Sequence, residues 1–167
     1  MKNHYFIYLI SIMSWTSWGC GTPTPDTVCD GLLPEIPTLT EIASAQVSWV
    51  EAGMTQNDSG TWSDGSNGDI TFGTISMVIA KSQNGENTAD LITANTFPIC
   101  IPLGERSEQG GNATDTGTFV TDAMHTGMIA ILGQENGEIV GRFQVVMGNA
   151  SGEIRDLQDG LFRVPQR

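Results

Sequence analysis

The sequence predicts an all-β domain, built as a single antiparallel sandwich of about eight strands, with a flattened barrel as the alternative. Three features support this prediction. Apolar and polar residues alternate with period two in several segments, as in half-buried strands. Asn-Gly and Asp-Gly pairs, which favour tight hairpin turns, separate some of these segments. The 20 glycines and the many Asn, Asp, Ser and Thr residues favour strands and turns over helices.

Residues 1–19 are organised as a secretory signal. Lys2 precedes an apolar run over residues 5–13, and small residues follow before Cys20. The uncharged stretch over residues 5–18 has 14 residues, whereas a helix that crosses a bilayer needs about 20. We therefore expect cleavage before Cys20 rather than a membrane span.

The residues around Cys20 resemble the lipobox of bacterial lipoprotein precursors. Gly19 and Cys20 match that motif, whereas Ser17 and Trp18 stand where the family usually has Leu and then Ala or Ser. The resemblance implies that the Cys20 sulfur carries a diacylglycerol and its amine a further acyl chain, which anchor the protein to a membrane. Ordinary secretion is the alternative, because Ser17 and Gly19 are small residues at the two positions that a general signal peptidase recognises.

Residues 20–28 are expected to form a tether between the anchor and the domain. Pro23 and Pro25 and the absence of apolar periodicity predict a short extended spacer. By the same resemblance, Gly21 stands where an Asp would favour the inner membrane, which indicates the outer membrane. A secreted or periplasmic protein is the alternative. The expected partners are the membrane, through the anchor, and an envelope protein or a glycan.

The cysteine count favours lipidation and a disulfide. The chain after cleavage holds Cys20, Cys29 and Cys100, and lipidation of Cys20 leaves an even pair. A Cys29–Cys100 disulfide would close a loop of about 70 residues and contribute about 4 kcal/mol in the chain-entropy model. Two separate buried thiols are the alternative. The spacing excludes a CxxC redox pair and a zinc site.

Composition bounds the domain and its partners. After cleavage about 148 of the 167 residues remain, enough for one domain, which we place at residues 29–167. The formal net charge is −12, and loss of Lys2 makes it −13. A field of this sign repels phosphate backbones, so nucleic acid is excluded as a partner. The same charge also serves to keep an exported protein soluble, so it names no partner.

The first half of the domain is predicted to contain an extended edge, strands and one long loop. Alternation over residues 43–49 places Trp49 on the inner face of a strand. Residues 52–69 are rich in Gly, Asn, Asp and Ser without a period, which predicts a loop. The other elements expected here are an extended edge over 29–40, a central strand over 70–80 and, after a turn at Asn84-Gly85, a return strand over 88–94.

The second half is predicted to begin with an edge strand. Over residues 97–103 four apolar side chains share one face, and Cys100 lies between two prolines on the other. Two prolines on one side cannot donate to a neighbouring strand, so this strand should lie at a sheet edge with Cys100 on its rim. A loop over 104–117 and a strand over 118–125 are expected to follow.

Two hairpins are predicted to close the chain. A type I′ turn at Asn136-Gly137 would join residues 128–132 to 139–147 and place Glu135 opposite Glu138. The same register would pair Met128 with Val145, Ala130 with Phe143 and Leu132 with Gly141. Residues 153–157 and 161–164 would pair across Asp159-Gly160. These closing segments resemble small β-rich lipoprotein domains of unknown function, and that resemblance implies no activity.

The 52–69 segment holds the candidate ligand-binding residues. Asp58, Asp64 and Asp69 offer hard oxygen ligands of the kind that calcium prefers, although the spacing is not that of an EF-hand. A solvated loop whose Asp residues stabilise turns is the alternative. Trp62 is a candidate platform for a sugar ring, or else an aromatic residue that folds back onto the core.

No catalytic constellation is recognisable, and no cofactor or resident metal is expected. His125 is the only histidine left after cleavage, and on a strand it would point away from Asp122 three residues earlier. The sequence lacks a G-x-S-x-G turn, an H-E-x-x-H motif and a phosphate-binding loop. We therefore expect a non-catalytic structural or interaction module. A carbohydrate- or calcium-binding module is the alternative, and a glycoside hydrolase is the least favoured.

Overall fold

The computed structural model describes residues 43–63, 68–78, 97–104 and 111–167, and the regular elements in these ranges are all β-strands. The strands are β1 (Gln46–Glu51), β2 (Met54–Ser63), β3 (Asp69–Phe72), β4 (Ile75–Val78), β5 (Ile99–Leu103), β6 (Asn112–Asp115), β7 (Phe119–Val120), β8 (Gly127–Glu135), β9 (Glu138–Gly148) and β10 (Ile154–Pro165). Adjacent strands pair antiparallel. The all-β antiparallel prediction is therefore confirmed. The signal, the tether, the 29–40 edge and the 88–94 strand lie outside the described residues.

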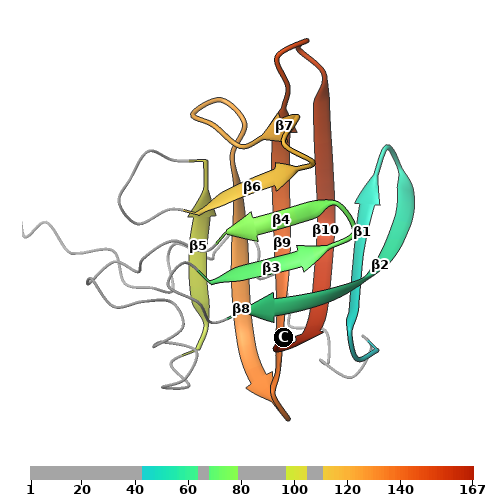
Figure 1. Ribbon diagram of the computed structural model, residues 1–167, viewed down its shortest axis with the longest axis vertical. Helices are drawn as coiled ribbons and strands as arrows, with labels where there is room; N and C mark the ends of the chain where they lie inside the picture. The colour runs from blue at the N-terminus through green and yellow to red at the C-terminus, as the bar shows by residue number, and fades with distance from the viewer. Residues whose placement is uncertain (1–42, 64–67, 79–96, 105–110) are drawn as a thin grey trace, which may run out of the picture.

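The strands close into a barrel, so the preferred sandwich was wrong and the alternative barrel is the architecture found. Hydrogen-bonded neighbours follow the order β10-β1-β2-β3-β4-β6-β7-β9, and β9 pairs again with β10 to close a ring of eight strands. β8 pairs along β9, and β5 adds to β8 outside the ring. In Figure 1, β3, β4 and β6 run across β8, β9 and β10. Alternation did not predict closure because it defines the two faces of a strand and not its neighbours.

The predicted 52–69 loop is largely a strand. β2 runs over ten residues and pairs first with β1 and then with β3. Its first half is exposed on both sides, and only Gly60 and Trp62 are buried. A strand that is exposed to solvent on both faces needs no alternation of apolar and polar residues. The polar composition of this segment was therefore mistaken for that of a loop.

Three further boundaries differ from expectation. The 70–80 strand is the hairpin β3–β4, which turns at Gly73 with φ 51°. The predicted 104–117 loop contains β6. The last predicted hairpin is one continuous strand, β10, in which Asp159 (φ 49°) belongs to a bulge between Leu157 and Gly160. In each case the local residue pattern was compatible with the expected element and with the observed one. Pairing with the neighbouring strands of the sheet determined which of the two formed.

The β8–β9 hairpin keeps the predicted register only near its turn. Glu135 faces Glu138 across Asn136-Gly137, as predicted, but a bulge between Ile131 and Gly133 then shifts the register by one residue. The predicted pairs are therefore wrong, and the observed ones are Met128–Gln144, Ala130–Arg142 and Ile131–Gly141. The shift turns Ile131 toward the core, where it is fully buried. Burial of apolar surface thus outweighed a regular ladder.

The two facing carboxylates of this hairpin share a cation from β10. Arg163 Nη2 lies 3.0 Å from Glu135 Oε2, and its Nη1 lies 3.3 Å from Glu138 Oε2. The like-charge contact that the sequence predicted is therefore compensated by a residue about 25 positions away, which no local pattern indicates.

Aromatic side chains from different parts of the ring meet in the core. The Phe72 ring centroid lies 5.2 Å from that of Trp49 and 5.4 Å from that of Phe143. The inward position predicted for Trp49 is confirmed, since only 7% of this residue is exposed. β5 lies at the edge of the sheet as predicted, with its three apolar side chains buried. The middle of the barrel is thus a packed core.

Candidate functional site

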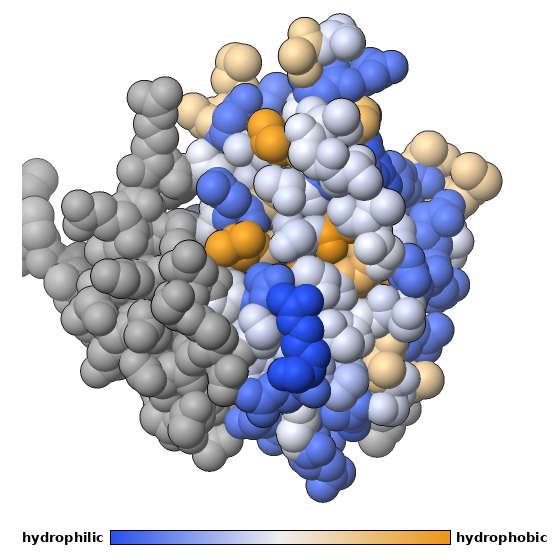
Figure 2. Space-filling view, in the orientation of Figure 1, coloured by the Kyte–Doolittle hydropathy of each residue, from blue (hydrophilic) through white to orange (hydrophobic). Residues whose placement is uncertain are grey.

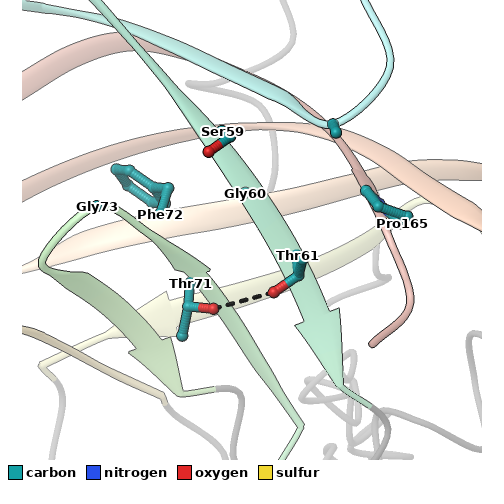
Figure 3. A pocket seen from close by; sticks show the side chains of 8 residues that line it. Ser59, Gly60, Thr61, Thr71, Phe72, Gly73 and Pro165 are labelled. Atoms are coloured by element: carbon teal, nitrogen blue, oxygen red, sulfur yellow. Dashed lines mark hydrogen bonds between the residues drawn. The ribbon is translucent and has the colours of Figure 1, made fainter.

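A shallow groove of about 330 Å³ lies on the β2–β3 pair beside the end of β10. It is lined by Ala45, Ser59, Gly60, Thr61, Thr71, Phe72, Gly73 and Pro165. Figure 3 shows Thr61 and Thr71 side by side on neighbouring strands, with Ser59 further along β2 and Pro165 on β10. The surface over this part of the molecule is mostly polar to neutral, with small apolar patches (Figure 2).

Gly60 shapes the floor of this groove. A Cβ atom at Gly60 would lie 2.7 Å from Val47 Cγ2 and 2.8 Å from Val164 Cγ1, so only glycine fits. The Gly60 N–H donates a 2.9 Å hydrogen bond to the carbonyl of Ala45, which itself has φ 59°. β2 therefore lies close to β1 and β10 at Gly60, and the outward side chains on either side of Gly60 border the groove.

The groove offers hydroxyl groups and apolar surface. The Thr61 and Thr71 hydroxyls lie 3.3 Å apart, and either one is able to donate to the other. A hydroxyl has one donor and two acceptor positions, so the pair keeps capacity for a bound group. Pro165 adds apolar contact, the Phe72 ring is turned into the core, and none of the lining residues is charged. This arrangement suits an uncharged ligand that presents both hydroxyl and C–H groups.

The structure separates the two predicted aspartates that it describes. Asp58 lies opposite Val47 and Asp69 opposite Ser63, so their positions are five residues apart along β2, about 16 Å. Asp64 lies outside the described residues. Asp58 and Asp69 therefore do not share a cation site, and the described ranges contain no group of three His, Cys, Asp or Glu residues placed to hold a metal ion.

Each of these aspartates has local partners. Asp58 Oδ1 accepts the backbone N–H of Ser59 at 2.7 Å, and its carboxylate occupies the space beside Gly73 at one end of the groove. Asp69 accepts a hydrogen bond from the Ser63 hydroxyl, and both of its oxygens lie 2.8 Å from Arg167 Nη2. The charge of Asp69 is thus compensated within the protein.

Trp62 is not an exposed platform. It lies on β2 rather than in a loop, is 3% exposed, and belongs to the core cluster. Its Nε1–H points to the carbonyl of Gly137 at 3.5 Å. The side chain packs onto the core, which was the alternative interpretation of the sequence. Alternate residues in the second half of β2 face the core, and Trp62 is one of them.

His125 and Asp122 are in contact, contrary to the prediction that they point apart. Residues 121–126 form a turn rather than a strand, in which Asp122 Oδ1 accepts the backbone N–H groups of Met124 (2.7 Å) and His125 (2.8 Å). His125 Nδ1 lies 3.0 Å from the same oxygen. The two backbone hydrogen bonds are the main cause that lowers the pKa of Asp122. The error arose from extending β7 beyond its two residues.

A charge cluster at one end of the barrel was not predicted. Arg155 of β10 forms two 2.7 Å hydrogen bonds with Glu51 of β1 and a further one with Asp115 of β6. The guanidinium group lies 6.0 Å from the centre of the Phe119 ring. The hydrogen bond from Arg155 lowers the pKa of Glu51 and raises that of Arg155 itself. The three strands are distant in sequence, so no spacing rule indicates this cluster.

The cysteine predictions stay predictions. Cys100 lies on β5, half-buried and opposite Ala130 of β8. Cys20 and Cys29 lie outside the described residues, so the structure tests neither the lipidation of Cys20 nor the Cys29–Cys100 disulfide.

Comparisons with protein-family models, with curated proteins and with solved structures find no match to this chain. Within the described ranges there is no helix with the length and apolar character needed to cross a membrane.

Proposed function

We propose that the protein is a non-catalytic binding module of the cell envelope, anchored to the outer membrane through lipid on Cys20, which binds an uncharged glycan in the β2–β3 groove. One observation carries the proposal: an acidic chain with 19 Asp and Glu residues has a groove whose lining residues are all uncharged, with the Asp58 carboxylate only at one end. A site with an uncharged lining on such a protein suits a neutral ligand, since the surrounding field disfavours anions.

The chemistry of the groove favours a sugar over other neutral ligands. A sugar ring presents hydroxyl groups at its edge and C–H groups on its faces. The Thr61 and Thr71 hydroxyls would exchange hydrogen bonds with the edge, and Pro165 would contact a face. The groove is shallow, which suits one or two sugar units of a longer chain rather than an enclosed small molecule.

The anchor is supported by the layout of residues 1–19 and by the cysteine count. Intact mass of the membrane-extracted protein tests it. We expect a chain that begins at Cys20 and carries added acyl mass. A chain that begins at Cys20 without that mass would leave the anchor unsupported. The same measurement before and after reduction and alkylation tests the Cys29–Cys100 disulfide.

Binding in the groove is tested by removing its hydroxyls at constant shape. The double variant Thr61→Val, Thr71→Val keeps side-chain volume and strand propensity, and Thr114→Val on the outer face of β6 is the matched control. We expect a panel of neutral oligosaccharides to contain a ligand whose affinity falls about tenfold or more in the double variant, since each hydrogen bond lost contributes about 1 kcal/mol. Unchanged binding in the double variant, or preference for acidic oligosaccharides, would refute the site.

A further inference from the structure

An apolar surface lies on the outside of the barrel where β7, β9 and β10 meet. Gly148 of β9 pairs with Val120 of β7 on one side and with Ile154 of β10 on the other. The preceding residue, Met147, is fully buried in the core, so Gly148 faces outward. Residues paired across antiparallel strands point to the same face, so Val120 and Ile154 flank Gly148 on the outer surface. Figure 1 shows β7 beside the ends of β9 and β10.

The His125 ring fills the space between these two side chains. A Cβ atom at Gly148 would collide with the Cε1, Nδ1 and Nε2 atoms of His125, so the ring covers the glycine. Asp122 holds the ring through its 3.0 Å contact with Nδ1. The neighbouring Met124 is 83% exposed. We call the surface formed by Val120, Met124, His125 and Ile154 the His125 patch.

Exposed apolar side chains concentrate in this patch. The described residues include four large hydrophobic side chains that are exposed. Two of them, Val120 (39%) and Ile154 (62%), flank Gly148, and a third, Met124 (83%), is the chain neighbour of His125. The fourth, Met54, lies at the tip of the β1–β2 hairpin. Exposed apolar surface that is gathered in one place, rather than scattered, is typical of an interaction site.

Carboxylates border the patch. Asp122 and Glu153 are exposed beside it, and Asp156 follows Ile154 on the same face of β10. Arg155, which lies between Ile154 and Asp156 on β10, points to the opposite face and binds Glu51 and Asp115. The charges that the described residues place around the patch are therefore negative.

We propose that the His125 patch is a docking site for a partner protein that presents apolar side chains surrounded by Lys and Arg. The apolar centre of the patch would contact the apolar side chains of the partner, and the carboxylate border would attract its Lys and Arg residues. A second copy of this chain would bring the same carboxylates, on a molecule of net charge −12, against its own. An anionic bilayer would be repelled in the same way. This inference is independent of the groove on β2–β3, which lies on other strands.

The experiment uses the full-length protein and synthetic peptides as probes. The first peptide has a Leu face bordered by Lys. The second replaces Lys with Glu, and the third replaces Leu with Ser. Binding is measured by fluorescence anisotropy, and the site by NMR shifts of the backbone amides. We expect saturable binding of the first peptide alone, with shifts at Val120, His125, Gly148 and Ile154. Shifts confined to other strands, or equal binding of all three peptides, would overturn the proposal.

Substitution at the patch supplies the second test. The double variant Met124→Ser, Ile154→Ser removes two exposed side chains, and Met54→Ser removes one of matching exposure, 61% against 62% for Ile154, from another hairpin. We expect the dissociation constant of the Leu-Lys peptide to rise tenfold or more in the double variant and to stay unchanged in Met54→Ser. Equal effects of both would indicate non-specific apolar contact and would overturn the proposal.

Two further outcomes would assign the patch to a different occupant. A dimer in sedimentation that the double variant abolishes would make a second copy of the chain the occupant. Binding to neutral phosphatidylcholine vesicles that the double variant abolishes would assign the patch to lipid. Either result would overturn the proposed protein partner. We expect a monomer, and vesicle binding that is equal for wild type and the double variant, because an acyl anchor on Cys20 acts apart from the patch and the carboxylate border favours a cationic surface.

Discussion

Replacing Arg155 with Met tests the charge cluster that links β1, β6 and β10. The side chains of Arg155, Glu51 and Asp115 are only 21%, 24% and 11% exposed, so the variant leaves two poorly solvated carboxylates without their cation. Among the described residues, Asp115 Oδ1 already has no hydrogen-bond partner. Breaking a fully buried ion pair costs about 3–5 kcal/mol, and a surface pair contributes about 0–1 kcal/mol. For these partly exposed groups we expect the free energy of unfolding to fall by about 2–3 kcal/mol at neutral pH.

The pH dependence of this loss gives a sharper test. Arg155 lowers the pKa of Glu51 below its ordinary value of 4.5 in the folded protein. The pair therefore stabilises the fold above pH 4.5, and this stabilisation is lost as the pH falls through the lowered pKa. Without Arg155 that contribution is absent at every pH. The difference between wild type and variant should thus be largest at neutral pH and shrink in acid.

Urea unfolding followed by tryptophan fluorescence measures the loss of unfolding free energy and its pH dependence, because Trp49 and Trp62 are buried. Arg167→Met is the matched control. Arg167 is 49% exposed and contacts Asp69, so its removal should cost less than about 1 kcal/mol. An unfolding cost of Arg155→Met that is no larger than that of the control at neutral pH, or that stays constant or grows below pH 4.5, would refute the stabilising role of this ion pair.

Two further substitutions test the packing of the barrel. Gly60→Ala should lower the free energy of unfolding by about 1–3 kcal/mol through contact with Val side chains, whereas Gly133→Ala, whose Cβ meets no atom within 4 Å, should have little effect on urea unfolding. Equal effects would contradict the close approach of β2. Arg163→Met should cost about 1–3 kcal/mol because Glu135 and Glu138 then face each other uncompensated. About 1 M salt should recover part of this loss by screening, and a loss unaffected by salt would contradict the electrostatic cause.

Local patterns in the sequence correctly predicted the features that depend on a single strand or turn. The inward position of Trp49, the edge position of β5 and the turn at Asn136-Gly137 were predicted from alternation, prolines and turn residues. The candidate site was predicted less well. The groove uses residues of β2, β3 and β10 and Ala45, which precedes β1, and its depth depends on the close approach of Gly60 to Val47 and Val164. A sequence shows that a glycine is present, but not which side chains approach it.

By itself the sequence determined that the chain is an antiparallel β protein of high negative charge, because side-chain alternation, turn residues and charge are properties of neighbouring positions. Only the tertiary structure decided that the sheet closes into a barrel, that Trp62 is buried, and that Arg155 meets two carboxylates from other strands. Those outcomes depend on which strands pair and where a bulge shifts their register. The physical reason is that pairing and burial are cooperative among residues far apart in the chain, whereas periodicity describes one segment at a time.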